Sequence, residues 1–418
     1  MKKAIMFFII SLLVSGCHPD TTSNELEKTE PKITLTIRNP KIEIASAFEE
    51  MTEAYEKEYP HVNIEVTTVG GALDDFSDLK AKIAAEEGPD IFTNPGYENA
   101  KLWEPYLENL SDQPWIESAY QETLEPVKID GNVYGMPMNL EGYGIIYNKS
   151  LFQRAGIEKL PSTFTELKTI TKQLETAGII PFATGYYEKW ILGDLLMNIA
   201  ISQQEDPDQF IRHLKNGTTS IENNQPFKQL IELLDLTIEY GGDNPLSTDY
   251  TMEIQQFASA KAAMMIQGNW IQPMINKMAP NLKMGIFPIT INDQAAKNPL
   301  NINVPGYWVI NKQTSAEKKE EAKRFLNWMV NSEQGQRFMT ERLHFIPAFS
   351  HMDMQITDSI TSKLTHLYQA NRKLSYNWSN LPPGLKEQFG ADTQQYIEHD
   401  WSKTQLLQAF QKTWRQMN

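Results

Sequence analysis

The sequence has a single cysteine, Cys17, among its 418 residues. One thiol cannot form a disulfide within the chain, so packing has to stabilise the fold. The seven histidines are scattered, and none shows the spacing of a zinc hydrolase. The G-x-S-x-G motif of serine hydrolases is missing. Penicillin-interacting enzymes need the motifs S-x-x-K, S-x-N and K-x-G in that order. The chain has S-x-x-K at Ser77 and Ser315 and S-x-N at Ser375 to Asn377, but no K-x-G follows. We therefore expect no catalytic residues, no metal ligands and no cofactor.

Basic residues are also comparatively few. The chain carries 38 Lys and Arg against 53 Asp and Glu, for a net charge of −15. So acidic a surface repels nucleic acid and anionic lipid headgroups, and we expect neither as a partner. The chain is longer than one hydrophobic core usually serves, which predicts two lobes. Aromatic residues are plentiful, with 9 Trp, 16 Tyr and 18 Phe.

The apolar run Ala4–Val14 is too short to span a membrane, because eleven residues at ~1.5 Å each cannot cross ~30 Å of hydrocarbon. Lys2 and Lys3 precede the run and small residues follow it, which is typical of a secretory signal. The segment resembles a bacterial lipoprotein signal, with "VSGC" matching the lipobox.

That resemblance implies cleavage after Gly16 and a diacylglycerol on the Cys17 sulfur. The protein would then sit outside the cytoplasm, anchored to the outer face of the cell membrane through this lipid only. An ordinary signal peptide with a chance cysteine is the alternative. The polar stretch His18–Lys32 that follows is predicted to be a flexible tether.

Hydrophobic periodicity after the tether alternates between that of strands and that of helices. Strands are expected at Ile33–Ile37, around Val62 to Val66 and within Gly88–Phe92, with helical faces at Ile44, Phe48, Met51 and Tyr55 and then at Phe76, Leu79 and Ile83. This β-α-β-α-β order is typical of a parallel sheet wound by helices.

The later part of the chain continues the alternation. A helix should begin near Thr163, whose capping-box partner is Glu166, and end at Gly178. Further expected elements are a helix end or strand at Met264–Ile266, a strand at Tyr307–Asn311, and helical stripes at Ala322, Phe325, Leu326, Met329 and Val330 and at Leu406, Leu407, Phe410 and Trp414.

Five motifs in order resemble the extracellular solute-binding proteins of ATP-driven carbohydrate importers, the group that includes maltodextrin-binding protein. They are "GPDIF", "GNVYGMPMNLEGYGIIYNKSLFQRAGI", "PSTFTEL", "ASAKAAMMIQGNW" and "EEAKRFLNWMVNSEQGQRF". The resemblance implies an α/β fold of two lobes, each a mostly parallel sheet flanked by helices, joined by hinge crossings near Pro137–Glu141 and Asn301–Pro305. The implied division is signal 1–16, tether 17–32, lobe one 33–139 and 304–349, and lobe two 142–300 and 350–418.

A site for a neutral saccharide needs aromatic faces for the sugar's C–H patches and charged or amide acceptors for its hydroxyls. Trp270, in "GNW", stands where the family often places a stacking tryptophan, and Glu141 where it commonly offers a hydroxyl acceptor. Tyr307 and Trp308 follow the second crossing. At least one of these two should be core, because successive strand side chains face opposite ways.

Other candidates are Asn39, Asn94 and Tyr97, which follow strands at the sheet edge where ligands of open α/β sheets bind. Lobe two offers Tyr186, Glu188 and Trp190 in "TGYYEKW", and Trp378 in a polar, Pro-rich loop. Core or surface packing is the alternative for each. The run "IRNPK" departs from the maltodextrin-binding pattern, which argues against a maltodextrin-like pose.

The sequence thus predicts a monomeric receptor, not an enzyme, that binds a mono- or oligosaccharide and delivers it to the permease subunits of an ABC transporter. A secreted glycoside hydrolase is the alternative, since it needs only two carboxylates ~5 to 9.5 Å apart. An adhesive surface lipoprotein is a third class, but it would not explain the ordered motifs. The identity and length of the sugar stay open.

Overall fold

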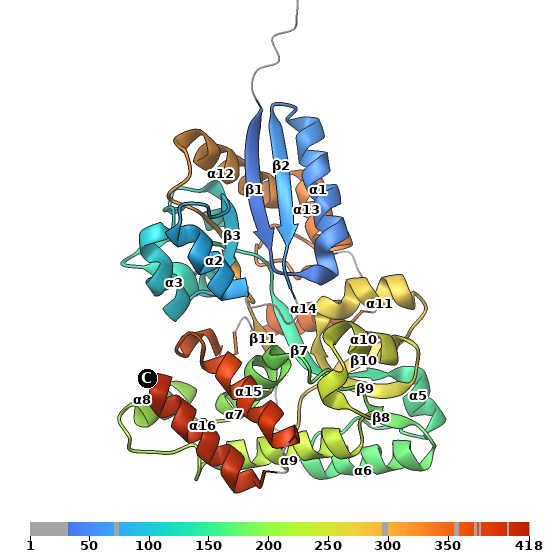
Figure 1. Cartoon of the computed structure of the whole chain (residues 1–418). Coiled ribbons are helices and arrows are strands. Elements are labelled where there is room, and N and C mark those ends of the chain that lie inside the picture. The colour runs from blue at the N-terminus through green and yellow to red at the C-terminus, as the bar shows by residue number, and fades with distance from the viewer. Residues whose placement is uncertain are drawn as a thin grey trace, which may run out of the picture.

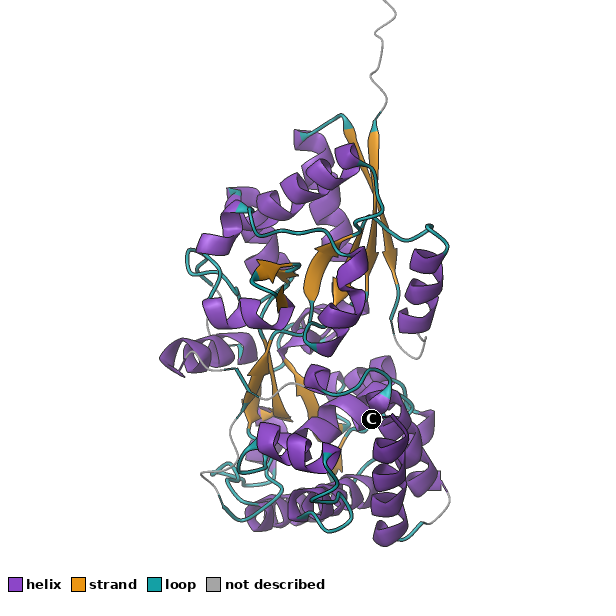
Figure 2. Ribbon diagram, turned by 90° about the vertical axis from the view of Figure 1, so that its left-hand side faces the viewer, coloured by secondary structure: helices purple, strands orange, loops and turns teal. Residues whose placement is uncertain are grey.

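The computed structural model describes residues 32–70, 75–294, 300–354, 359–371, 374–375, 378–398 and 401–417. The predicted signal and Cys17 lie outside these residues. The described chain forms two lobes, each containing one larger sheet, and Figure 2 shows the two sheets end to end with helices packed around them. Within the described part, no helix has both the length and the hydropathy to cross a membrane.

The sheet of lobe one has the strand order β2-β1-β3-β12-β6. Its strands are β1 (Ile33–Asn39), β2 (Val62–Thr68), β3 (Ile91–Asn94), β6 (Met136–Pro137) and β12 (Tyr307–Ile310). β1 pairs in parallel with β2 and β3, whereas β12 pairs antiparallel with β3 and β6. The strand that arrives from the other lobe therefore runs against the rest.

Helices flank this sheet as the periodicity predicted. Phe48, Met51 and Tyr55 of α1 are fully buried, as is Ile44 in the turn before it. The helical segments here are η1 (Ile42–Ile44), α1 (Ala45–Glu58), α2 (Asp75–Ala84), α3 (Glu98–Trp103), η2 (Glu104–Tyr106), η3 (Pro114–Glu117), α4 (Gln121–Leu124), η4 (Glu125–Val127), α12 (Ala316–Asn331), α13 (Glu333–Arg337) and η9 (Phe338–Arg342). A small hairpin, β4 (Lys128–Ile129) with β5 (Asn132–Val133), lies beside them.

Lobe two repeats the arrangement around β7. Its strands are β7 (Glu141–Asn148), β8 (Ile180–Phe182), β9 (Ala262–Gly268), β10 (Met284–Phe287) and β11 (Asn301–Asn303). β7 is antiparallel to β9, β10 and β11, and β8 is parallel to β9. The other strands thus share one direction, and β7, which comes from lobe one, is again the reversed strand. The expected two-lobed α/β fold is confirmed. The sheets are mixed rather than mostly parallel, because the reversed strand in each forms antiparallel pairs with its neighbours.

The helices of lobe two include the expected capped helix α6. Thr163 Oγ1 accepts the Glu166 N–H at 3.2 Å, but the Glu166 carboxylate accepts the N–H of Ser162, one residue earlier than a capping box requires. The helical segments are α5 (Lys149–Arg154), α6 (Phe164–Thr176), η5 (Ile191–Leu196), α7 (Met197–Ser202), α8 (Pro207–Lys215), α9 (Gln225–Glu239), η6 (Pro245–Ser247), α10 (Tyr250–Ala258), η7 (Asn269–Ile271), α11 (Gln272–Met278), η10 (Trp378–Asn380), α15 (Leu385–Glu398) and α16 (Lys403–Met417).

Two crossings join the lobes where they were expected, between β6 and β7 and between β11 and β12. A further helix, α14 (Ile360–Asn371), lies between the lobes in Figure 1. It bonds to both, because Tyr368 Oη donates to Glu122 at 2.7 Å and Lys363 Nζ donates to the Ile286 carbonyl at 2.7 Å. The boundary at residue 349 therefore stays a prediction.

Candidate functional site

Three aromatic rings meet in lobe two where β9 ends. The indole of Trp190 packs edge-to-face against Tyr250, with ring centroids 5.6 Å apart, and against Trp270 at 6.3 Å. They come from separate elements: the turn before η5, the start of α10, and η7. Both tryptophans remain partly exposed, whereas Tyr250 is buried. We call these rings the aromatic cluster.

A short chain of hydrogen bonds fixes the Trp270 indole. Its Nε1 donates to Gln267 Oε1 at 2.9 Å, and Gln267 Nε2 donates to Glu253 Oε2 at 2.8 Å. Gln267 and Glu253 are both buried. The indole folds back over the main chain at Gly268, where a Cβ would lie 2.1 Å from the ring. Glycine at this position is therefore what lets Trp270 adopt its orientation.

Two buried oxygens beside the cluster have no hydrogen-bond partner among the described residues: Tyr250 Oη and Glu188 Oε2. Their side chains are only 5% and 3% exposed. A buried polar atom left unpaired costs about 1–3 kcal/mol, so each such atom requires an explanation. The Glu188 carboxylate does accept the backbone N–H of Tyr250, which fixes its position. Atoms that are held in place yet unpaired are what a polar ligand would satisfy.

Charged residues from lobe one and the hinge form a second group. Lys41, in the loop after β1, bonds to Glu141 at the start of β7 (2.6 Å) and to Glu43 (3.2 Å). All three side chains are largely buried. Burial lowers the pKa of Lys41, but the two carboxylates outweigh it and raise that pKa above its ordinary value. We call these residues the lysine cluster.

The phenol of Tyr250 is affected by carboxylates of both groups. Burial is the main cause that raises the pKa of its phenol, and nearby carboxylates raise it further. Those carboxylates come from both sides of the junction: Glu43 and Glu141 of the lysine cluster, and Glu253 and Glu188 beside the aromatic cluster. The unpaired hydroxyl of Tyr250 is thus under the electrostatic influence of acids from lobe two, the hinge and lobe one.

This arrangement suits the recognition of a polar molecule with apolar faces. The exposed parts of Trp190 and Trp270 offer flat surfaces, while Glu188 and Tyr250 offer unpaired oxygens. Over the described ranges, no three Asp, Glu, His or Cys side chains are grouped so that they could hold a metal ion.

Of the predicted site residues, Trp270, Trp190, Glu188 and Glu141 are brought together at this junction. Asn39 is adjacent, but its amide is used internally. Its Oδ1 accepts the Lys41 N–H at 3.1 Å, and its Nδ2 donates to the Lys41 carbonyl and to Thr68 Oγ1. We therefore interpret Asn39 as the residue that holds the Lys41 loop in place.

Tyr186 and Trp308 lie in the cores. The Tyr186 hydroxyl pairs with Thr237 Oγ1 at 2.5 Å in lobe two. Trp308 is 1% exposed and stacks on Phe48, with centroids 5.3 Å apart. The expectation that at least one residue of the Tyr307–Trp308 pair is core is confirmed, and Tyr307 is also fully buried.

The candidates after β3 have structural partners. Asn94 Oδ1 accepts the Gly96 N–H at 2.8 Å and shapes the turn. Tyr97, the residue before α3, has an unusual positive φ of 53° and bonds through its phenol to Asn380 of lobe two. It therefore contacts the opposite lobe, but its partner there, Asn380, is not one of the residues of the aromatic cluster. The side chain of Trp378 lies outside what the structure describes.

The sequence analysis missed five residues of this junction: Lys41, Glu43, Tyr250, Glu253 and Gln267. Gln267 offered a signal, since it is a polar residue directly before "GNW" in an otherwise apolar strand. Lys41 and Glu43 follow the strand that already pointed to Asn39. Tyr250 and Glu253 gave no usable signal, because residues three apart on a helix have the same spacing whether they face a core or a ligand.

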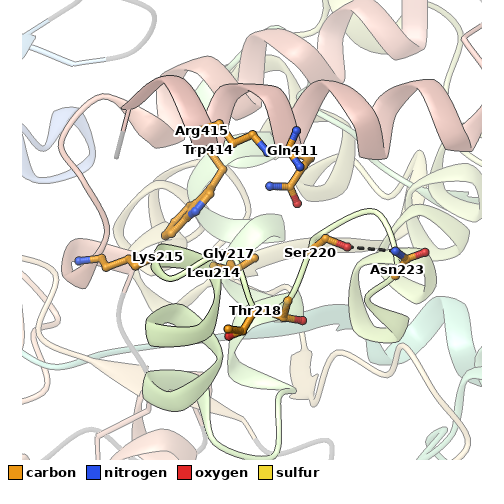
Figure 3. Close-up of a pocket in the computed structure, with 10 residues that line it drawn as sticks. Leu214, Lys215, Gly217, Thr218, Ser220, Asn223, Gln411, Trp414 and Arg415 are labelled. Atoms are coloured by element: carbon orange, nitrogen blue, oxygen red, sulfur yellow. Dashed lines mark hydrogen bonds between the residues drawn. The ribbon is translucent and has the colours of Figure 1, made fainter.

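A second candidate is a hollow of about 730 Å³ between the end of α8 and α16 (Figure 3). Several of its polar groups are already paired: Gln411 Oε1 accepts the Ile221 N–H, and Asn223 bonds to Ser220. Its tryptophan, Trp414, is only 3% exposed and so offers little face for stacking. The junction is therefore the better candidate despite the size of this hollow.

Two α/β lobes with a reversed crossing strand in each, and a polar and aromatic junction between them, define a two-lobed ligand-binding protein. The chain belongs to the family of bacterial extracellular solute-binding proteins, whose model matches residues 39–336. The predicted family is confirmed, and membership implies a location outside the cytoplasm. The family consists of substrate-binding proteins rather than enzymes.

Curated relatives and solved structures agree with this assignment. The chain is 22% identical over 337 residues to the multiple sugar-binding protein of Streptococcus mutans, covering 79% of this chain and 78% of that protein. It is 23% identical over 345 residues to the melibiose/raffinose/stachyose-binding protein MelE of Bacillus subtilis, covering 79% and 77%. The structure of RafE in complex with raffinose matches with a TM-score of 0.79 at 21% identity, covering 92% of this chain and 100% of that one, which shows the fold.

Proposed function

We propose that this protein is the receptor of an ABC importer, and that it binds a neutral saccharide between its lobes. The observation that carries the proposal is the junction itself, where Trp190 and Trp270 offer ring faces beside the unpaired oxygens of Tyr250 and Glu188. The names of the relatives support an oligosaccharide, and those of MelE and RafE put raffinose first among the ligands to test. Nothing in the comparisons supports the glycoside hydrolase alternative.

The two clusters suggest how binding and closure are coupled. Ring faces of lobe two would stack on the sugar's C–H patches, while carboxylates on either side of the junction accept its hydroxyls. These groups meet only when the lobes are together, so a bound sugar favours the closed state. It does so by the difference between its affinities for the two states.

The remaining parts of the proposal concern the cell surface. Lipid on Cys17 would anchor the receptor to the outer face of the membrane through a tether that ends near Lys32. A monomer in its closed state would dock on the permease subunits, and ATP hydrolysis by the transporter would reopen it.

A thermal-shift screen of residues 18–418 tests the function. The panel should contain raffinose, melibiose, stachyose, maltose and galactose, with sodium chloride and citrate as non-saccharide controls. A ligand that binds only the folded state raises the melting temperature, by an amount that grows with its concentration. We expect at least one oligosaccharide to do so. A panel without any saccharide-dependent shift would contradict the proposal.

A further inference from the structure

Glu253 is a buried acid that forms no ion pair with any residue that the structure describes. It lies in the first turn of α10 with 2% exposure, and its Oε2 accepts the hydrogen bond from Gln267. The main chain also packs closely against it, since a Cβ on Gly185 would lie 2.7 Å from Oε2. None of the causes that act on its pKa is a cation. The positive charge of Lys41 is already shared by Glu43 and Glu141.

Among the titratable groups near Glu253, the carboxylate of Glu188 opposes its ionisation. Glu188 and Tyr186 face it from the chain that precedes η5, and Tyr250 faces it from its own helix. β9 contributes no titratable side chain, and the lysine of α11, Lys277, is exposed. A carboxylate in such surroundings loses its hydration without gaining an ion pair, whereas a neutral carboxylic acid avoids most of that cost.

The pKa of Glu253 follows from this environment. Burial is the main cause that raises it, to about 8, and Glu188 adds to the rise. The hydrogen bond from Gln267 acts in the opposite direction but is the weaker influence. The amide of Gln267 also fixes where a proton can be. Because Oε2 accepts from Gln267, the proton belongs on Oε1, to which no described residue donates a hydrogen bond.

We propose that Glu253 is a specificity-determining residue that keeps its proton at neutral pH and donates it to an acceptor oxygen of the bound saccharide. The inference rests on the proposed function of the junction. A carboxylic O–H at Glu253 complements Glu188, whose unpaired oxygen accepts from a ligand hydroxyl. Ring and glycosidic oxygens of a sugar accept hydrogen bonds but cannot donate them. A site with both kinds of group therefore fixes the orientation of the sugar, which carboxylates alone cannot do.

Calorimetric titration of residues 18–418 from pH 6 to pH 9.5 tests this donor. The ligand is raffinose, or the saccharide with the largest thermal shift if raffinose gives none. For the native chain we expect a constant Kd up to about pH 7 and weaker binding above about pH 8, approaching tenfold per pH unit as Glu253 ionises. For Glu253→Gln, whose amide also donates, we expect a Kd within about threefold of the native value at pH 6.5 and no break up to pH 9.5.

Glu188→Gln is the matched control in the same cluster. It removes the opposing acceptor, so it should weaken binding at every pH. The break should remain but move below its position in the native chain, because the charge of Glu188 contributes to the raised pKa of Glu253. Difference infrared spectroscopy without ligand gives an independent readout, since the native chain should show a carboxylic-acid C=O band at pH 7 that Glu253→Gln lacks. Circular dichroism confirms that each variant is folded.

Several results would overturn the inference about Glu253 while leaving the proposed function intact. They are a native Kd that stays constant to pH 9.5, a Glu253→Gln variant that binds at least tenfold more weakly at pH 6.5 or retains the break, or a missing carboxylic-acid band. If no saccharide in the panel binds the native chain, the proposed function itself fails and the inference fails with it.

Discussion

Lys41 and Glu141 lie 100 positions apart in the sequence, yet their side chains form an ion pair of 2.6 Å. The lysine follows the first strand of lobe one, and the glutamate is the first residue of the strand that enters lobe two. Asn139 also donates to the same Glu141 oxygen, at 3.2 Å. The start of the crossing strand is thus fixed by bonds from lobe one and from the crossing itself.

Replacing the lysine should therefore destabilise the protein. In Lys41→Met, the buried carboxylates of Glu43 and Glu141 lose their shared cation, which typically costs about 3–5 kcal/mol. Urea unfolding measures the loss. Lys57→Met is the control, because the Lys57–Glu53 pair is exposed and should change stability by less than about 0.5 kcal/mol. Equal stability of the two variants would show that the buried cluster contributes nothing.

Trp270→Ala should weaken sugar binding without unfolding the chain. Loss of a stacking ring face costs about 0.5–1.5 kcal/mol beyond the lost contact area, and this stacking part alone corresponds to a Kd about 2- to 13-fold higher. Titration calorimetry measures the change. Tyr187→Ala is the matched control, since Tyr187 is close in sequence to the aromatic cluster but 50% exposed. If both variants keep the native Kd, Trp270 does not contact the ligand.

The raised pKa of Glu253 predicts how stability depends on pH. The unfolded chain releases this proton near its ordinary pKa of 4.5, whereas the folded chain keeps it to about 8. Between these values the folded state binds the extra proton, so its stability falls as pH rises. Glu253→Gln cannot lose a proton there. The melting temperature of this variant, minus that of the native chain, should therefore increase from pH 5 to pH 8. Scanning calorimetry measures both temperatures. A difference that stays constant over this range would contradict the prediction.

The packing of α15 on η5 predicts a position that requires glycine. A Cβ on Gly193 would lie 1.8 Å from the Lys386 carbonyl oxygen. Gly193→Ala must therefore push the two elements apart, which we expect to cost about 1–3 kcal/mol or more. Gly242→Ala is the control, because its nearest neighbour would be a side-chain atom at 3.7 Å. Chemical denaturation of both should show a loss for Gly193→Ala alone, and equal stability would contradict the close approach.

The fold was largely predictable because buried apolar residues recur along the sequence with the spacing of a helix or of a strand. The face of α1 that carries Phe48, Met51 and Tyr55 is an example, and all three are buried. The same rule fails for β12, which lies inside its sheet between β3 and β6. Both of its faces are covered, so Tyr307 and Trp308 are both buried, and alternation cannot assign one of them to a ligand.

The site was predictable only where a motif marked it. Trp270 and Glu141 could be found from "GNW" and from the start of the crossing strand. Tyr250 and Glu253 could not, since their role depends on how α10 packs against β9 and on which acids the junction brings near. Asn39 shows the opposite limit: its place after a strand was predicted, but its amide binds the Lys41 loop.

A crystal structure grown with the best saccharide of the screen tests the central claim most directly. We predict density for the sugar against the rings of Trp190 and Trp270, with its hydroxyls within hydrogen-bond distance of Tyr250 Oη and Glu188 Oε2. Sugar density in the hollow beside Trp414, with the junction unchanged, would contradict the account.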